Sequence, residues 1–356
     1  MPSSSFVFCC EIGWEDAVAD ELKCAFSGGD VRPIANGWVT IDGTAVSRST
    51  TPTVALASQC LPEARQLEVG SIANCVRSVG KQIVETLCDF TGPWRLHVFA
   101  NYAPEGTVPR RRAELIERGI IELLRKKQRR LLRTLSAGDE LFADTEALFQ
   151  IGLVTPSSGF SSVCLPGVLR TWRRCASPFP GGAVEVPPDR NAPSRAFAKL
   201  VEAELRLGCR IAAGETCVDL GSSPGSWTYV ALNRGARVIA VDRSPLRADL
   251  MRHPNLTFVR GDAFRFAPQA PVDWLLCDVI AFPDRVLALL EHWLTDRWCR
   301  KFCATIKFRG RGDYSMLEPF KTMLEGSGAE FQLRRLNSNK NEVTAMGMLA
   351  GSPEIL

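Results

Sequence analysis

The stretch CVDLGSSPGSWTYVAL at residues 217–232 decides the fold class of this chain. A short run of strand-forming residues leads into Asp219, a loop of small residues follows, and an apolar helical pattern begins at Trp227. A strand, a tight loop and a helix in this order form the usual nucleotide-binding turn of an open α/β sheet. The loop has neither the G-x-G-x-x-G spacing of a dinucleotide site nor the terminal Gly-Lys-Ser/Thr of a phosphate loop. Its ligand must therefore be inferred from the rest of the chain.

The last part of the chain alternates regularly between strand and helix patterns. The strand patterns lie at residues 216–221, 237–242, 256–262, 272–279 and 302–308. Helical patterns between most of them indicate a doubly wound parallel sheet. The end differs, because EFQLRRLN, the polar turn SNKN and EVTAMGML predict a hairpin over residues 330–349. An α/β, Rossmann-like sheet of seven strands that ends in an antiparallel hairpin is the outline of a class I methyltransferase, more than of a dehydrogenase.

The composition is that of an ordinary globular protein with a small positive charge. Of the 356 residues, 46% are hydrophobic and 23% are charged, and the net charge is +4. No apolar run of about 18 residues is present, so no membrane span is expected, and the first residues lack the basic segment of a signal peptide. The 13 cysteines contain no C-x-x-C pair, which argues against a structural zinc site or a disulfide framework. We expect a cytoplasmic protein with reduced thiols, no bound metal and no membrane partner.

The N-terminal half resembles small α+β modules that precede a linker. Residues 176–192 are rich in Pro and Gly and predict that linker, which leaves residues 193–356 for the C-terminal domain. The strongest local charge excess lies at residues 110–133, with ten basic and three acidic residues. Apolar residues recur there at helical spacing, which predicts an amphipathic helix with a cationic outer face. That face can be simply solvated or can contact nucleic acid, and the sequence leaves both open.

The loop after the first strand of the C-terminal domain favours a ligand without phosphate groups. Gly221 and Gly225 allow a tight turn and a close backbone approach, whereas Pro224 has no N–H to donate near the helix start. S-adenosylmethionine fits these features better than a dinucleotide does. Asp242 ends the second strand, where a carboxylate can accept both hydroxyls of an adenosine ribose. Asp262 follows the third strand and can meet the adenine edge, or the amine of the cofactor through water. The candidate cofactor-binding residues are Asp219, Gly221, Ser222, Ser223, Pro224, Gly225, Ser226, Trp227, Asp242, Asp262 and Asp278.

Four ionisable residues are candidates for catalysis. Asp278 ends the fourth strand pattern, Lys307 lies inside the apolar run FCATIKF, and Glu342 begins the last strand. If that strand is antiparallel beside the fifth, these three residues meet at the same sheet edge as the ligand loop. Lys199 lies in a helix whose N-cap is predicted at Ser194. Taken singly, each lysine is more easily explained as a residue whose head reaches solvent.

These motifs together resemble a known family. NAPSRAFAKLVEAE, VDLGSSPGSWTY, VDRSP, DWLLCD, RWCRKFCATIKF and NEVTA are similar to the ribosomal RNA large-subunit methyltransferase M (RlmM) family, within the RrmJ/FtsJ-like group of RNA ribose 2′-O-methyltransferases. In the N-terminal half the resemblance is looser, and CEIGWEDAVADEL implies a ferredoxin-like module at residues 1–65 and a THUMP-like RNA-binding domain at 66–175. For the active site the resemblance implies a catalytic tetrad of Lys199, Asp278, Lys307 and Glu342.

The resemblance also implies the reaction, which is methyl transfer from S-adenosylmethionine to a ribose 2′-hydroxyl, at a cytidine of large-subunit (23S) rRNA. A hydroxyl is a poor nucleophile at neutral pH, so a base must take its proton. Burial and the cation of Lys199 favour the neutral amine of Lys307, which makes Lys307 the candidate base. Asp278 and Glu342 would orient the lysines and balance charge. The family's loop usually has Pro-Gly-Gly, whereas this chain has Ser226 at the last position, and Ser is small enough that cofactor binding should survive.

Two other classes of function are compatible with parts of the sequence. A non-catalytic RNA-binding or ribosome-assembly protein can keep this fold, but it has no need of a lysine within an apolar strand. A nicotinamide-dependent oxidoreductase is disfavoured by the loop spacing and by the terminal hairpin. The expected partner is RNA, and a monomer is the expected state.

Overall fold

The computed structural model describes residues 5–26, 29–42, 52–101, 107–136, 138, 140–310 and 312–350. The chain divides into two compact units, Met1–Ala183 and Val184–Leu356. The division falls inside residues 176–192, the segment that the sequence predicts as a linker. No helix in the described ranges combines the length and the apolar character that a membrane crossing needs.

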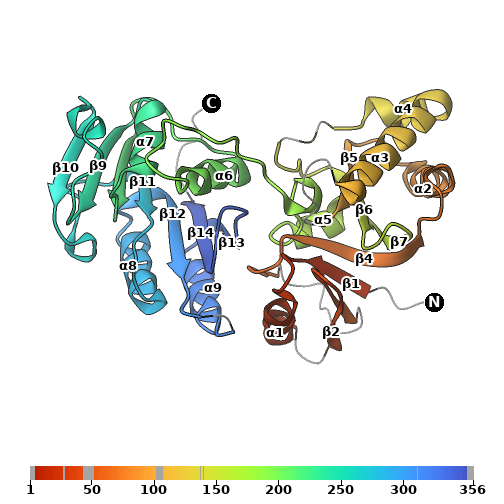
Figure 1. Ribbon diagram of the computed structural model, residues 1–356, viewed down its shortest axis with the longest axis horizontal. Coiled ribbons are helices and arrows are strands. Elements are labelled where there is room, and N and C mark those ends of the chain that lie inside the picture. Colours follow the sequence, from red (N-terminus) through yellow and green to blue (C-terminus); the bar gives the residue numbers. More distant parts are fainter. Residues whose placement is uncertain are drawn as a thin grey trace. The chain divides into compact units, whose positions relative to one another are not determined.

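The N-terminal unit contains a seven-stranded sheet in the order β2-β3-β1-β4-β7-β6-β5 (Figure 1). Its strands are β1 (Ser5–Cys9), β2 (Val31–Ala35), β3 (Trp38–Asp42), β4 (Gln59–Glu68), β5 (Trp94–Ala100), β6 (Ala147–Leu153) and β7 (Ser158–Cys164). Its helices are α1 (Glu15–Ala25), α2 (Ile72–Leu87), α3 (Val108–Lys127), α4 (Arg129–Arg133), α5 (Pro166–Trp172) and the 3₁₀ turn η2 (Pro180–Gly182).

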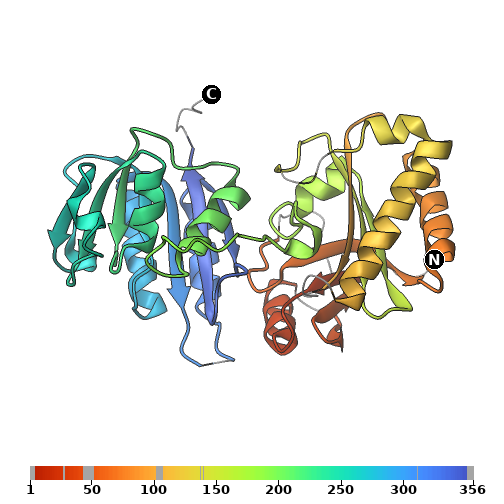
Figure 2. The same ribbon diagram turned by 45° about the horizontal axis from the view of Figure 1, so that its top comes forward.

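Strand β4 ties the two halves of this sheet together. Its first part pairs antiparallel with β1, and its last four residues, from Arg65 to Glu68, pair antiparallel with β7. The boundary predicted between residues 65 and 66 therefore lies within one continuous strand. Helices α2 and α3 pack side by side, as the orange and yellow helices in Figure 2, and their buried apolar residues share one core with β5 and β6.

The basic segment at residues 110–133 forms two helices rather than one. Gln128 leaves the helical conformation with φ −144°, which ends α3 and starts the short α4. The amphipathic pattern itself is present, because Ile116, Ile120 and Leu124 are buried while the basic residues of the last turn of α3 are exposed. The prediction of a single helix is therefore wrong, because the charge pattern gives no sign of the break at Gln128.

The C-terminal unit contains a second seven-stranded sheet, in the order β10-β9-β8-β11-β12-β14-β13. Its strands are β8 (Thr216–Leu220), β9 (Arg237–Asp242), β10 (Leu256–Arg260), β11 (Val272–Cys277), β12 (Cys299–Lys307), β13 (Ala329–Arg334) and β14 (Glu342–Leu349). Its helices are α6 (Phe197–Leu207), α7 (Ser226–Asn233), α8 (Pro283–Thr295) and α9 (Leu317–Gly326), with the 3₁₀ turns η3 (Leu250–Arg252) and η4 (Ala263–Arg265).

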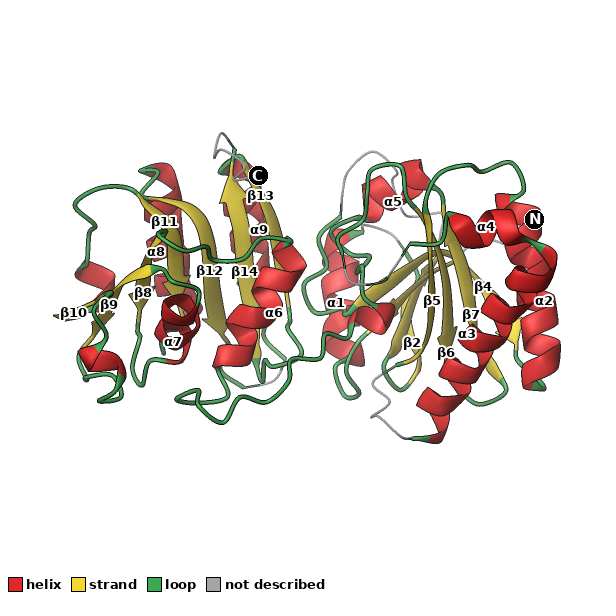
Figure 3. Cartoon of the chain, turned by 90° about the horizontal axis from the view of Figure 1, so that it is seen from above, coloured by secondary structure: helices red, strands yellow, loops and turns green. Residues whose placement is uncertain are grey.

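The order and direction of these strands produce the predicted α/β fold. Strands β8 to β12 pair in parallel, and β14 is inserted antiparallel between β12 and β13. Helices α6 and α7 cover one face of the sheet and α8 and α9 cover the other (Figure 3). Buried strands with apolar side chains on both faces, such as β11, are typical of a sheet covered in this way. The carboxyl ends of the five parallel strands consequently meet at one edge.

Candidate active site

A cavity of about 400 Å³ opens at the carboxyl ends of the parallel strands in the C-terminal unit. A volume of this size suits a small ligand or cofactor. The predicted cofactor residues that line the cavity are Asp219, Gly221, Ser222, Ser223, Pro224, Ser226, Trp227, Asp242, Asp262 and Asp278. Lys307 lines it as well, whereas Gly225, Lys199 and Glu342 are predicted site residues that lie outside the described lining.

Two glycines permit the tight loop that follows β8. Gly221 has a φ of +73°, and a Cβ at this position would lie 2.6 Å from Cγ1 and 3.0 Å from Cα of Val279, the second residue after β11. Gly225 is the N-cap of α7 with a φ of +110°, and a Cβ there would collide with Leu250. Because L side chains rarely adopt these conformations, glycine is required at both positions. Gly221 allows the ends of β8 and β11 to approach closely, and Gly225 allows the loop to pack against Leu250.

The carboxylate of Asp242 is fixed by two backbone amides. Its Oδ2 accepts a hydrogen bond from the N–H of Ser223 at 3.0 Å, and its Oδ1 accepts one from the N–H of Ser244 at 2.8 Å. A carboxylate oxygen can accept two hydrogen bonds. Both oxygens therefore keep the capacity to accept a hydroxyl from a ligand in the cavity.

Asp262 is held in a similar way after β10. Its Oδ1 accepts a hydrogen bond from the N–H of Phe264 at 3.0 Å, and Arg243 lies 2.8 Å from its Oδ2. The Phe264 amide and then the Arg243 cation lower the pKa of the Asp262 carboxyl, so this group is a carboxylate at neutral pH. The guanidinium of Arg285 lies 3.9 Å from the centroid of the Phe264 ring, and both side chains line the cavity.

Asp219 differs from these two acids because it is fully buried. Burial raises the pKa of its carboxyl to about 7, against the opposing effect of a hydrogen bond from Thr228 Oγ1 to its Oδ2 at 2.6 Å. Near neutral pH this carboxyl is therefore close to half protonated.

Of three serines around the loop, one has a hydroxyl that is free to bond a ligand and two contact each other. The hydroxyl of Ser222 is buried and has no partner among the described residues. Buried hydroxyls normally have a partner, so a ligand atom is expected to satisfy this one. The hydroxyl of Ser226, by contrast, lies 2.7 Å from that of Ser194. The side chain that replaces the family's glycine thus ties the loop to the segment before α6.

The predicted N-cap of α6 is wrong. The helix begins at Phe197 and its N-cap is Ala196, with no capping side chain. The Ser194 hydroxyl instead accepts a hydrogen bond from the N–H of Ala196 at 3.2 Å within a turn, and it also contacts Ser226. Trp227 donates from its ring N–H to the Ala196 carbonyl at 2.9 Å. These contacts with the cofactor loop, rather than a helix cap, account for the position of Ser194.

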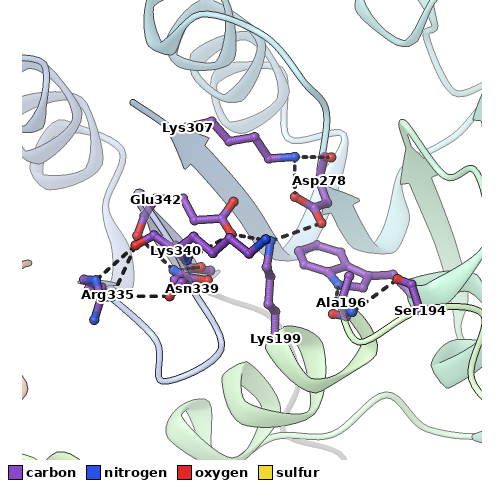
Figure 4. Close-up of polar contacts among 11 residues, drawn as sticks. Ser194, Ala196, Lys199, Asp278, Lys307, Arg335, Asn339, Lys340 and Glu342 are labelled. Atoms are coloured by element: carbon purple, nitrogen blue, oxygen red, sulfur yellow. Dashed lines mark hydrogen bonds and ion pairs between the residues drawn. The ribbon is translucent and has the colours of Figure 1, made fainter. Parts of the chain in front are cut away.

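The four predicted catalytic residues form one continuous chain of ion pairs, which Figure 4 shows. Nζ of Lys199 lies 2.6 Å from Oε1 of Glu342 and 3.4 Å from Oδ2 of Asp278. Nζ of Lys307 lies 2.9 Å from Oδ1 of Asp278 and donates a hydrogen bond to its backbone carbonyl at 3.0 Å. Asp278 is therefore shared between two ammonium groups.

The sheet topology explains why these residues meet. Lys307 is the last residue of β12 and pairs across the antiparallel ladder with Glu342, the first residue of β14. Asp278 directly follows β11, which runs parallel to β12. Lys199 reaches them from the first turn of α6, and its side chain is 9% exposed. The Lys307 side chain is 26% exposed and lines the cavity, so it is the member of the chain best placed to touch a substrate.

The turn between β13 and β14 is tied to α6 by buried polar groups. Glu202 on α6 accepts the N–H of Asn337 with its Oε1 at 3.0 Å and its Oε2 at 2.9 Å. Within the turn, the side-chain amide of Asn339 donates to the Glu342 carbonyl at 3.1 Å. Both sets of contacts hold the start of β14, and with it Glu342, against Lys199.

The charges that line the cavity favour a cationic ligand. Four carboxyl groups face three basic side chains, namely Asp219, Asp242, Asp262 and Asp278 against Arg243, Arg285 and Lys307. Two of the basic groups are already paired within the site. Because Asp219 is close to half protonated near neutral pH, the acidic excess is small, and its sign favours a cation over a phosphate. Among the described residues no group of three or more His, Cys, Asp or Glu is arranged to hold a metal ion.

The sequence-based list misses several lining residues that lie in loops or in the first turns of helices. Examples are Ser194, Arg243, Phe264, Ile280 and Arg285. Arg243 and Ile280 directly follow predicted strand ends, and this position in the sequence could have identified them as lining residues. Phe264 and Arg285 carry no such signal, because a 3₁₀ turn and the first turn of α8 bring them in.

Comparison with known proteins shows similarity to methyltransferases. Residues 192–306 match the family model described as FtsJ-like methyltransferase. The chain is 33% identical over 232 residues to a ribosomal RNA large subunit methyltransferase M of Laribacter hongkongensis, and the match covers 62% of this chain and 64% of the relative. A protein of the same name from Halorhodospira halophila is 36% identical over 169 residues, which cover 47% of this chain and 50% of the relative.

The chain thus spans less than two thirds of the length of these curated relatives. Among solved structures, one similar chain is the 1,6-didemethyltoxoflavin-N1-methyltransferase of Burkholderia thailandensis, solved with bound S-adenosylhomocysteine. It is 17% identical to this chain, with a TM-score of 0.35, and the match covers 44% of this chain and 79% of that chain. The sequence matches confirm the resemblance that the motifs predict. Residues 192–306, which lie in the C-terminal unit, are similar to FtsJ-like methyltransferases, and the chain is similar to the ribosomal RNA large subunit methyltransferase M proteins.

Proposed function

We propose that this protein is an S-adenosylmethionine-dependent RNA ribose 2′-O-methyltransferase that modifies large-subunit rRNA, at a cytidine. The observation that carries the proposal is the ion-pair chain from Lys307 through Asp278 and Lys199 to Glu342, at the edge of a cofactor-sized cavity. The similarity to rRNA methyltransferases named M supports the choice of substrate.

The residues of the cavity fit S-adenosylmethionine. The two oxygens of Asp242 can each accept one ribose hydroxyl, because the amides of Ser223 and Ser244 use only part of their capacity. The unpartnered hydroxyl of Ser222 offers one further donor or acceptor. The acidic lining suits a sulfonium cation and disfavours the pyrophosphate of a nicotinamide dinucleotide. The cofactor supplies an electrophilic methyl group.

Lys307 is the proposed general base. Nζ would take the proton of the ribose 2′-hydroxyl as the hydroxyl oxygen bonds to the methyl carbon and the carbon–sulfur bond breaks. This role requires the neutral amine. The Asp278 carboxylate is shared between the ammonium groups of Lys199 and Lys307, so it is not dedicated to Lys307 alone.

The other three residues position the base. Asp278 fixes Nζ of Lys307 with a side-chain oxygen and its backbone carbonyl. Lys199 fixes Asp278, and Glu342 in turn neutralises Lys199. Each carboxylate therefore sits against an ammonium group, which offsets the cost of burying the charges.

For the N-terminal unit we propose an RNA-binding role, with a ferredoxin-like part and a THUMP-like part. What supports it is the exposed basic end of α3 and α4, formed by Arg125, Lys126, Lys127, Arg129 and Arg133. Clustered Lys and Arg attract the phosphate backbone independently of sequence.

The proposal is tested with tritiated S-adenosylmethionine and large-subunit rRNA transcribed in vitro, which carries no modifications. The labelled RNA is digested to nucleosides, and the chromatographic position of the label separates ribose methylation from base methylation. We expect 2′-O-methylcytidine. Label on a base would contradict the ribose specificity, and cofactor binding without any transfer to rRNA or assembled particles would favour a non-catalytic RNA-binding protein.

A further inference from the structure

A stacked pair of side chains lies beyond the ion-pair chain, outside the proposed cofactor contacts. The guanidinium carbon of Arg309 is 3.8 Å from the centroid of the Phe282 ring. Phe282 is the N-cap residue of α8 and is 45% exposed. Near it in the same loop, Ile280 is 94% exposed. An aromatic ring, a cation and an aliphatic side chain are thus presented together to solvent.

The topology places this cluster next to the proposed base. Ile280 comes two residues after Asp278, and Arg309 comes two residues after Lys307. Strands β11 and β12 are parallel neighbours, so the segments that follow them leave the sheet at the same edge. Ile280 also lines the cavity. These side chains therefore lie beside the edge of the sheet at which Lys307 lines the cavity.

Arg309 has no ion-pair partner among the residues that the structure describes. Two other exposed arginines of this unit, Arg300 and Arg243, are paired with Asp273 and Asp262. Within the described ranges Arg309 contacts no carboxylate at ion-pair distance, and its guanidinium lies over the Phe282 ring. A cation–π contact at an exposed site contributes only about 0.5–1 kcal/mol. Stability alone therefore gives little reason to keep an unneutralised cation and an exposed ring together here.

We propose that Phe282 and Arg309, flanked by Ile280, form a stacking platform for an unpaired base of the RNA segment whose ribose reaches Lys307. This inference rests on the proposed function and adds the mode of substrate binding. Proteins that act on single-stranded RNA stack the splayed bases on aromatic rings and on guanidinium planes. The charge of Arg309 also complements the adjoining phosphates. A base held here would bring its own or the neighbouring ribose to the tetrad.

The test compares Phe282→Leu, which keeps an apolar side chain but removes the ring, with Arg309→Ala. The matched control is Arg300→Ala, which removes an exposed arginine from the opposite end of the same strand β12. Methyl transfer to rRNA transcribed in vitro gives kcat and KM, and calorimetry gives the affinity for S-adenosylhomocysteine. Stacking of one base contributes about 1–3 kcal/mol, which corresponds to roughly a 5- to 150-fold change in KM.

We expect Phe282→Leu and Arg309→Ala each to raise the KM for RNA about tenfold, with kcat and cofactor affinity within about twofold of the wild type. Phe282→Trp, which keeps a stackable ring, should retain the wild-type KM, and so should Arg300→Ala. An unchanged KM in the first two variants, or an equal rise in Arg300→Ala, would overturn the platform while leaving the proposed function intact. A wild-type protein that methylates no RNA would overturn both.

Discussion

Replacement of Lys199 by Met should loosen the active-site edge of the sheet far more than replacement of Lys307 by Met. Both changes remove one positive charge and keep an aliphatic chain. Lys199 is 9% exposed and is the cation that lies against Glu342, whose side chain is 10% exposed. Its loss leaves that carboxylate buried without a cation. Breaking a buried pair by removing one partner costs about 3–5 kcal/mol.

The smaller effect of Lys307→Met follows from the same geometry. Lys307 is 26% exposed, and its partner Asp278 still has Lys199 at 3.4 Å. The cost should then be about 1 kcal/mol, which is typical of partly exposed pairs.

Hydrogen exchange of the full chain, read by mass spectrometry over β12 and β14, measures this difference locally. With 1.4 kcal/mol for each factor of ten, Lys199→Met should speed exchange in β14 roughly 140- to 3,700-fold, and Lys307→Met about fivefold. The matched substitution Lys301→Met, at the other end of β12, should leave β14 near Glu342 unchanged. If Lys307→Met loosens β14 as much as Lys199→Met does, the proposed order of the ion-pair chain is wrong.

Three further predictions concern strand β8 and the loop that follows it. The folded-state pKa of Asp219 is about 7, against an ordinary 3.8. The protonated carboxyl therefore stabilises the fold fully below about pH 4, and this stabilisation is lost as the pH rises through 7. The free energy of unfolding should fall by ~4 kcal/mol over this range. Asp219→Asn should therefore abolish a decline in the melting temperature between pH 5.5 and 8, and an unchanged decline would contradict this. Gly221→Ala should cost about 2–4 kcal/mol through its left-handed φ and the contact with Val279, and should weaken S-adenosylhomocysteine binding in calorimetry. Ser226→Gly removes the contact with Ser194 and should lower stability by about 1 kcal/mol with cofactor affinity within about threefold; a larger gain in affinity would show that the serine hinders binding.

The C-terminal sheet could be read from the sequence because its strands are buried on both faces. Continuous apolar runs bounded by turn residues mark β8, β9, β11 and β12 to within about three residues. The polar turn SNKN likewise located the hairpin of β13 and β14. The juxtaposition of Lys307 and Glu342 then followed from the strand directions alone.

Two strands of the N-terminal sheet could not be read in this way. β2 contains Pro33, and most of its residues are exposed at the sheet edge. β4 contains Pro62 and Glu63, whose φ is +52°, and its pairing with β1 shifts register nearby. A proline and charges within a run indicate a loop in sequence-based reasoning. Only the pairing of β4 with both β1 and β7 reveals it as the central strand.

Site residues could be predicted where an ionisable side chain directly follows a strand, and they were missed where a turn or helix start brings a side chain to the cavity. Asp242 and Asp278 belong to the first kind. Phe264, Arg285 and Phe282 belong to the second, because their positions depend on how a 3₁₀ turn and the start of α8 pack. Such packing has no periodic signature in the sequence.

The central claim is that Lys307 takes the proton of a ribose hydroxyl, and a single-turnover experiment with Lys307→Ala tests it most directly. The variant is loaded with tritiated S-adenosylmethionine, mixed with rRNA transcribed in vitro, and compared with the wild type after cofactor affinity has been measured by calorimetry. Loss of a general base should slow methyl transfer about 10²- to 10⁴-fold, with cofactor affinity within about twofold. A near-normal rate in a variant that binds cofactor normally would contradict the account.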